Sequence, residues 1–154
     1  MKIRFTVAPI PFFPMQDSLL IQRLRDVSKD ADDFLYVQHD LIEDLPSDDA
    51  HQGNVQVILD FMERYPDLDY GAPGALVHYV EQFELGYYTR ALVESIQRTP
   101  TASTLTMLRR IINGTPEGEH REALINLLRS VAENEDGQID PDIADLAEVH
   151  LEDL

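Results

Sequence analysis

The sequence contains no cysteine, and this absence excludes several kinds of chemistry at once. A chain without thiols forms no disulfide, has no thiolate nucleophile and offers no sulfur ligand to a metal. With 154 residues, 44% of them hydrophobic, the chain is long enough to bury a core without such cross-links. We therefore expect a single domain, 1–154, that works in a reducing compartment, with the cytoplasm as its location.

Basic residues are scarce as well: 12 lysines and arginines stand against 29 aspartates and glutamates, for a net charge of −17. Phosphate recognition depends on clustered lysine and arginine, so neither direct nucleic-acid binding nor attachment to an acidic membrane surface is expected. No apolar run approaches the roughly 20 residues that a membrane-spanning helix requires. The composition leaves a basic protein as the favoured partner.

The acidic residues are segregated along the chain. Residues 30–60 hold nine of them and no lysine or arginine, whereas residues 90–129 hold six arginines against four acids. The segment 134–154 again lacks lysine and arginine and is acidic. This distribution predicts a helical body with strongly acidic flanks, which would attract a positively charged partner.

The spacing of apolar residues predicts an all-α fold of about eight helices. Three stripes end at Val27, before Pro46 and before Pro66, and the first follows an expected cap at Asp17. Five further helices are expected at 73–83, 87–98, 102–113, 116–133 and 142–154. Short connections favour antiparallel hairpins stacked in one domain, with 73–83 paired to 87–98 and 102–113 paired to 116–133. Because no sequence repeat recurs, we leave open whether the hairpins stack as in HEAT or armadillo repeats.

Proline, glycine and threonine mark the expected boundaries. Pro73 and Pro116 are read as first helical residues, Gly86 as a turn, and Asn113-Gly114 as a left-handed helix end. Thr101 or Ser103 is the expected cap of the helix over 102–113. At the N-terminus, three prolines follow an alternating apolar pattern, so residues 1–16 are expected to form an extended arm.

The segment 134–140 resembles the middle of a calcium-binding loop, with Gly137 at its turn. Aligning Gly137 with the sixth loop position places Ala132 and Ile143 where the first and last oxygen ligands are required. Neither side chain carries oxygen, so an Asp-Gly turn between two helices is the expected structure.

The five histidines never occur four residues apart, the spacing that puts two metal ligands on one helix face. His78 lies beside Val77 and Tyr79, which predicts a partly buried helical residue, and His120 is expected in the first turn of a helix. Nucleophile elbows, phosphate-binding loops and dinucleotide fingerprints are missing. We therefore expect no catalytic, cofactor or metal site, although a deep pocket joining His78 to Glu81 and Tyr88 would reopen the alternative of an enzyme.

Two stretches carry a resemblance to a known group: Tyr70-Gly71-Ala72-Pro73-Gly74-Ala75-Leu76-Val77-His78-Tyr79, and Arg98-Thr99-Pro100-Thr101 with Thr104 and Met107-Leu108-Arg109-Arg110-Ile111-Ile112-Asn113. They resemble small helical immunity proteins of bacterial polymorphic-toxin and contact-dependent inhibition systems. The resemblance implies a cytoplasmic, non-catalytic antitoxin that binds one cognate toxin domain. It also implies that Gly71, Pro73 and Gly74 shape a turn and that certain apolar side chains face the core, namely Leu76, Met107, Leu108 and Ile111. The acidic flanks and the N-terminal arm lie outside it.

A toxin that degrades nucleic acid needs a basic cleft, which an acidic helical surface can occupy as phosphates would. We expect toxin contact at the acidic residues of 30–49 together with two aromatic anchors: Asp30, Asp32, Asp33, Tyr36, Asp40, Glu43, Asp44, Asp48, Asp49 and Tyr70. The alternative is a non-catalytic helical scaffold or adaptor that binds another protein or peptide. Oligomeric state is not readable from the sequence.

Overall fold

The computed structural model describes residues 18–27 and 29–154, except for the side chains of Ala31 and Asp32. In this part of the chain there are eight α-helices, one short 3-10 helix and no strand, which confirms the all-α prediction. The helices are α1 (Leu19–Asp26), α2 (Ala31–Ile42), η1 (Asp49–His51), α3 (Gly53–Arg64), α4 (Ala75–Val80), α5 (Leu85–Arg98), α6 (Ala102–Gly114), α7 (Glu119–Glu133) and α8 (Pro141–Glu152). The expected arm, 1–16, lies outside the described residues.

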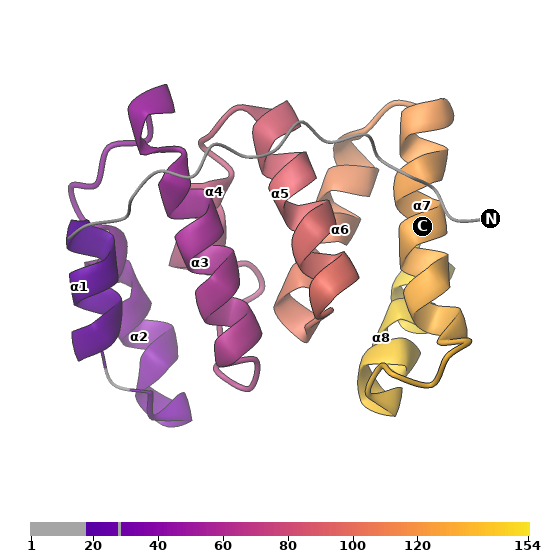
Figure 1. Ribbon diagram of the computed structural model, residues 1–154, viewed down its shortest axis with the longest axis horizontal. Coiled ribbons are helices and arrows are strands. Elements are labelled where there is room, and N and C mark those ends of the chain that lie inside the picture. The colour runs from indigo at the N-terminus through magenta and orange to yellow at the C-terminus, as the bar shows by residue number, and fades with distance from the viewer. Residues whose placement is uncertain (1–17, 28) are drawn as a thin grey trace.

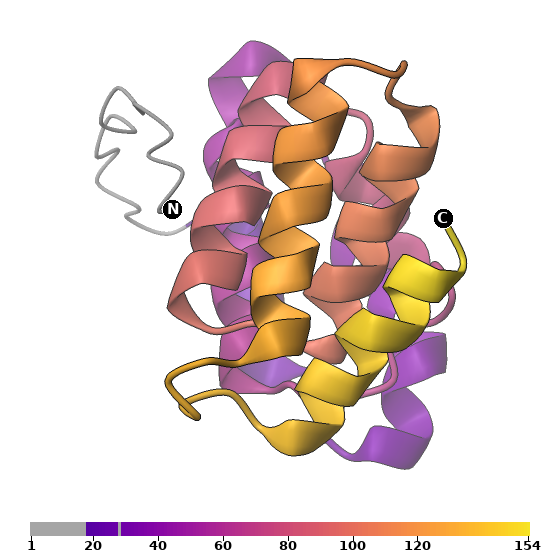
Figure 2. The same cartoon turned by 90° about the vertical axis from the view of Figure 1, so that its right-hand side faces the viewer.

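The helices form a row of antiparallel hairpins in two layers (Figure 1). Helices α1, α3, α5 and α7 follow one another in the layer that faces the viewer, and α2, α4, α6 and α8 form the layer behind. Figure 2 shows the far end of the row, where α7 runs alongside α5 and α8 crosses it obliquely. Stacked antiparallel hairpins were predicted, and this packing confirms them.

The hairpin frame differs from the expected one by a single helix. We expected α4 to pair with α5 and α6 with α7, but the main contacts join α1 to α2, α3 to α4, α5 to α6 and α7 to α8. Helix α4 packs against α2 and α3 instead, and α6 contacts both α7 and α8. With only six residues, α4 is too short to cover the length of α5, and this explains why α5 packs mainly on α3 and α6.

One continuous hydrophobic cluster runs through all eight α-helices. Its fully buried members include Leu20, Phe34, Ile58, Leu76, Leu92, Leu108, Leu128 and Ala147. Burial of a large aliphatic or aromatic side chain stabilises a fold by about 1.5–3 kcal/mol, so this cluster dominates the packing. The residues that the family resemblance placed in the core are buried as expected, with Met107 at 0% and Ile111 at 7% exposure.

Side-chain caps decide where several helices begin. Ser18, and not the expected Asp17, caps α1, because its Oγ accepts a hydrogen bond from the Ile21 N–H at 3.1 Å. Thr101 caps α6 as predicted, in a reciprocal arrangement with Thr104. The Glu84 carboxylate accepts hydrogen bonds from the first N–H groups of α5, so Gly86 lies inside the first turn of that helix and does not form the expected loop.

The Tyr70–Gly74 turn replaces the helix start expected at Pro73. Gly71 has φ +83°, which favours glycine, and a Cβ on Gly74 would lie 1.9 Å from the Tyr70 carbonyl oxygen. These constraints keep Pro73 in the turn, and α4 begins two residues later. The buried Gln38 side chain of α2 then accepts a hydrogen bond from the Leu76 N–H at 3.3 Å. Gly71, Pro73 and Gly74 thus shape a turn, as the resemblance implied.

The connection between α6 and α7 also differs from the prediction. Gly114 is the last residue of α6, and the chain leaves the helix at Thr115 in an extended conformation. The positive φ expected at Asn113-Gly114 occurs at Gly118 instead, with φ +149°. Gly118 is the N-cap of α7, so that helix begins at Glu119 and not at Pro116.

The turn between α7 and α8 is the predicted Asp-Gly turn. Asn134 adopts the left-handed conformation, and its side chain bonds both the N–H and the carbonyl of Ile139. Gly137 supplies a second positive φ, +69°. Asp140 then caps α8 through the Asp142 N–H. Across the described helices, none combines the length and apolar character needed to cross a membrane.

Candidate protein-binding surface

Helix α2 presents a strongly acidic outer face. Its inner face buries Phe34, Gln38 and Leu41, which turns the residues between them outward. Asp33, Tyr36, Asp40 and Glu43 follow one another at spacings of three and four, so they share one side of the helix. We call this face and the loop after it the α2 acidic surface: Asp33, Tyr36, Asp40, Glu43, Asp44, Asp48 and Asp49.

Tyr36 is the most exposed large apolar side chain in the described chain, with 78% of its surface accessible. Its neighbour Leu35 is also exposed, at 36%. Aromatic side chains of this kind are enriched at the centres of protein interfaces, where they bury a large area at a small entropic cost. An exposed tyrosine surrounded by carboxylates therefore suits contact with a basic protein surface.

The carboxylates of the α2 acidic surface lack basic partners within the described residues. No lysine or arginine of 18–27 and 29–154 forms an ion pair with Asp33, Asp40, Glu43, Asp44 or Asp49. Asp48 contacts only His51, and Asp49 accepts a hydrogen bond from Gln52 at 3.4 Å. Their mutual repulsion is thus left uncompensated by the described part of the chain, and an incoming positive surface would relieve it.

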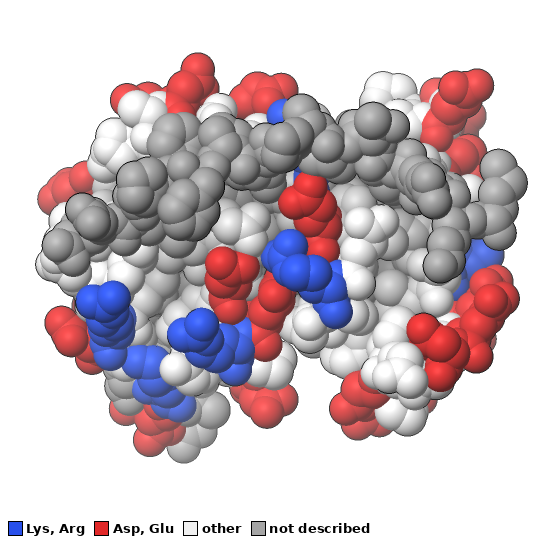
Figure 3. Space-filling view, viewed as in Figure 1, with Lys and Arg blue, Asp and Glu red and all other residues white. Residues whose placement is uncertain are grey.

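Elsewhere the basic side chains are engaged. Arg98 pairs with Glu63 at 2.7 Å and Asp60 at 3.7 Å, Arg110 pairs with Glu81, and Arg109 pairs with Asp153. Figure 3 shows basic and acidic side chains lying next to one another near the middle of the face made by the odd-numbered helices. Charge on that face is locally balanced, in contrast to the α2 acidic surface in the other layer.

Arg23 holds the end of the α2 acidic surface in place. Its guanidinium donates hydrogen bonds to the carbonyls of Leu41 and Glu43, at 3.1 and 2.8 Å. These carbonyls belong to the last turn of α2, where a cation is favourable. Asp44 follows in the left-handed conformation, with φ +59°, and starts the loop toward η1. The sequence offered no signal for this contact, because Arg23 lies 20 residues before Glu43.

Two other expected contact residues need separate statements. Asp30 is exposed, and its carbonyl accepts hydrogen bonds from the first N–H groups of α2. Asp32 lies in α2, and its side chain is outside what the structure describes.

Tyr70, expected as a second aromatic anchor, belongs to the core. Only 2% of its surface is exposed, its ring packs edge-on against Phe34, and its hydroxyl donates a hydrogen bond to the Tyr65 carbonyl at 2.8 Å. Burial raises the pKa of its phenol well above the ordinary value. A partner could not reach this ring, so we remove Tyr70 from the contact set.

The C-terminal helix α8 provides a second row of exposed acids, at Asp142, Asp145, Glu148 and Glu152. Val149, at 50% exposure, lies among them. Helix α8 stands at the opposite end of the row from α2 (Figure 1), so the two acidic faces are separate surfaces. Charge density alone does not distinguish them; the exposed aromatic ring is on α2.

The pocket required by the enzyme alternative is only partly present. A shallow hollow of about 360 Å³ is lined by Glu81 and Tyr88 together with Arg110. His78 does not line it; contrary to our expectation its side chain is 59% exposed, 3.5 Å from the Glu81 carboxylate. The hydrogen bond from Arg110 lowers the pKa of Glu81, which suits an ion pair between α4 and α6 better than proton transfer at neutral pH.

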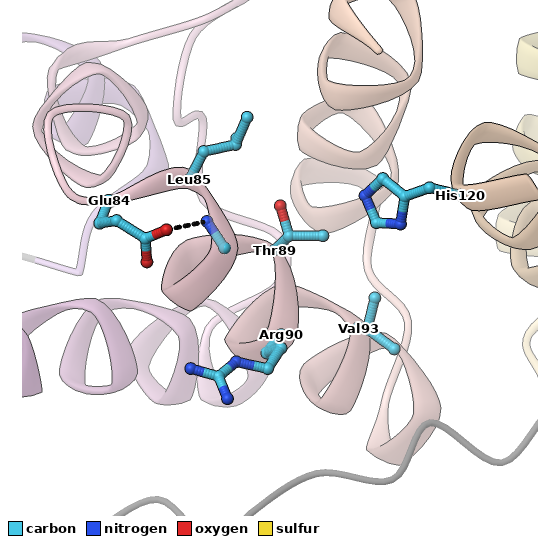
Figure 4. Close-up of a pocket in the computed structure, with 7 residues that line it drawn as sticks. Glu84, Leu85, Thr89, Arg90, Val93 and His120 are labelled. Carbon is cyan, nitrogen blue, oxygen red and sulfur yellow. Dashed lines mark hydrogen bonds between the residues drawn. The ribbon is translucent and has the colours of Figure 1, made fainter. Parts of the chain in front are cut away.

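A second hollow lies between α5 and α7 and measures about 550 Å³. Figure 4 shows His120 of α7 facing Thr89 and Val93 of α5 across this space. Groups of three or more histidine, aspartate or glutamate side chains that could hold a metal are not found among the described residues.

Comparison with known proteins gives no relative for this chain: no family model, no curated protein and no solved structure matches it.

Proposed function

We propose that this chain is an immunity protein that binds a cognate toxin domain and blocks a basic site on it. The observation that carries the proposal is the α2 acidic surface, where an exposed Tyr36 stands among carboxylates that have no basic partner in the described chain. Such a surface speeds encounter with a positively charged partner, and its aromatic ring offers a point of dry contact. The cytoplasm, where a toxin would have to be neutralised, is the proposed location.

In this proposal the acids and the ring have different roles. Carboxylates on the outer face of a helix act at distances up to the Debye length, about 8–10 Å at physiological salt, and so steer the partner and set its orientation. The Tyr36 ring acts only on contact, by filling a depression on the partner. Charge reversal should therefore alter the association rate, and removal of the ring should alter the dissociation rate.

The direct test is growth rescue. A bacterium expresses the C-terminal domain of the secreted protein encoded immediately upstream of this chain, with and without the chain itself. We expect the domain to be toxic alone, and the chain to restore growth and to co-purify with it. Toxicity that the chain does not relieve would contradict the proposal and favour a helical adaptor that binds some other protein or peptide.

A second experiment locates the contact. Asp33, Asp40 and Glu43 are changed together to lysine, and the matched control carries Asp145→Lys, Glu148→Lys and Glu152→Lys on α8, with the same change in net charge. Electrostatic steering raises association rates by about 10- to 1,000-fold, so the α2 variant should associate at least about tenfold more slowly at low salt. Equal effects of the two variants would show that only net charge matters and would remove α2 from the proposal.

A further inference from the structure

The hollow between α5 and α7 combines apolar walls with polar groups that lack partners. Leu85, Val93 and the Thr89 methyl contribute apolar surface, and Leu85 is 60% exposed. Thr89 is only 6% exposed, yet its hydroxyl forms no hydrogen bond with any described residue, and neither does the His120 ring. Buried hydroxyls are normally paired, so this site suits an occupant with both apolar side chains and free backbone groups.

An extended peptide is such an occupant, because its N–H and C=O groups are not paired within a helix. The chain itself contains one. Residues 1–17, outside the described part, include Phe5, Ile10, Phe12 and Phe13, and three prolines that restrict the backbone and favour an extended path. The first 16 residues also hold Lys2 and Arg4 and no acid, the opposite of the acidic body.

The described chain begins where such a segment could reach the hollow. Ser18 caps the N-terminus of α1, and the odd-numbered helices all run in the same direction (Figure 1). The N-terminal ends of α1, α5 and α7 therefore lie at the same end of the molecule. Leu19, in the first turn of α1, is a further large apolar side chain left exposed, at 50%.

The distances also agree. Packed helices lie about 8–10 Å apart, so the path from α1 past α3 and α5 to the hollow is about 25 Å. An extended chain advances about 3.3 Å per residue, so about eight residues cover that path. Counting back from Ser18 brings Ile10 to the hollow and leaves Phe5 for the α7 side. The segment is long enough without strain.

We propose that residues 1–17 lie across the face of the odd-numbered helices and that apolar side chains around Ile10 fill the hollow between α5 and α7. The backbone of the segment supplies hydrogen-bond partners to the Thr89 hydroxyl and the His120 ring. The segment thereby joins the middle of the row to α7 on a side where α5 and α7 leave a gap. This inference is independent of the proposed function.

Because the chain has no cysteine, an engineered pair of cysteines reports proximity without interference. Phe5, Ile10 and Phe12 are changed one at a time to cysteine in a chain that carries His120→Cys, and the matched control carries Glu148→Cys on α8. Mild oxidation should give an intramolecular disulfide with His120→Cys, fastest for Ile10, and at least about tenfold less with Glu148→Cys. Equal rates for the two positions, or disulfide-linked dimers in place of monomers, would overturn the proposal.

A second measurement uses the full chain without cross-links. In an Ile10→Asp, Phe12→Asp variant, amide hydrogen exchange should rise in residues 85–93 and 119–125, which surround the hollow. Residues 102–113 of α6, away from it, serve as the internal reference and should be unchanged. Unaltered exchange around the hollow would show that the segment does not cover it.

Discussion

Two buried tyrosines offer a matched test of how the core handles polar groups. Tyr79 and Tyr88 are 1% and 2% exposed, so their rings are equally enclosed. The Tyr79 hydroxyl donates a hydrogen bond to the Pro46 carbonyl at 2.7 Å and accepts one from the Asn54 amide at 3.0 Å. The Tyr88 hydroxyl is buried without a partner in the described chain, and burial raises its pKa.

These surroundings predict opposite results for the same substitution. Tyr79→Phe removes two hydrogen bonds and leaves the Asn54 amide unpaired in the core, which should lower the free energy of unfolding by about 1.5–3 kcal/mol. In a domain of this size that corresponds to a fall in Tm of about 3–10 °C. Tyr88→Phe removes an unpaired hydroxyl, so the free energy of unfolding should stay within about 0.5 kcal/mol or rise by up to about 1 kcal/mol.

Urea denaturation followed by circular dichroism measures both variants, with the unfolding midpoint reporting stability. The slope of the transition should not change, because the same surface is exposed on unfolding in each case. A loss of stability in Tyr88→Phe equal to that in Tyr79→Phe would refute the reasoning, since it would mean that the Tyr88 hydroxyl makes a stabilising bond.

Three further predictions concern single residues. Tyr36→Ala should weaken toxin binding by about 30-fold if the ring is a contact centre, as titration calorimetry would measure, while the unfolding midpoint stays unchanged. Gly74→Ala should lower the unfolding midpoint in urea, because its Cβ would collide with the Tyr70 carbonyl; Gly114→Ala, in open space, is the control. Burial first, and Arg109 second, lower the pKa of His150. The unfolded chain therefore takes up the proton more readily, and the stability that His150 contributes is present above about pH 6.5 and lost as the pH falls. His150→Gln should lose less stability than the parent between pH 7.5 and 5.5 in urea titrations.

Periodicity predicted the helices well because burial and helical spacing agree along most of the chain. The expected stripes through Phe34, Ile58, Leu92 and Leu108 all lie in the core. Where a helix begins depends on a few hydrogen bonds, and those are less visible in a sequence. Glu84 is an example, since its carboxylate caps α5 and draws Gly86 into the helix, although an isolated glycine reads as a turn.

The pairing of helices was not readable from local patterns. Pro73 is compatible with a first helical position, and nothing in 73–83 shows that Gly74 must pass within contact of Tyr70 and Gln38. That approach shortens α4 and shifts the hairpin frame by one helix. The constraint acts between residues more than 30 positions apart, and a single sequence carries no signal for it.

The candidate surface was predictable in its charge and not in its aromatic content. The acids of 30–49 could be picked out by the absence of lysine and arginine. Tyr36 and Tyr70 looked equivalent in sequence, yet one is 78% and the other 2% exposed. Tyr36 lies on the same side of α2 as Asp40, and this helical phase was available from the positions of Phe34 and Leu41.

The location of α2 at one end of the row has a consequence for how a partner would act. In the described chain, the α1–α2 hairpin has a neighbouring hairpin on one side only, and in stacked helical arrays such end units open first. A protein bound to the outer face of α2 would stand where a further hairpin would otherwise pack. It would extend the array by one unit and suppress opening of the terminal pair, so complex formation would be felt as slower amide exchange in α1 and α2.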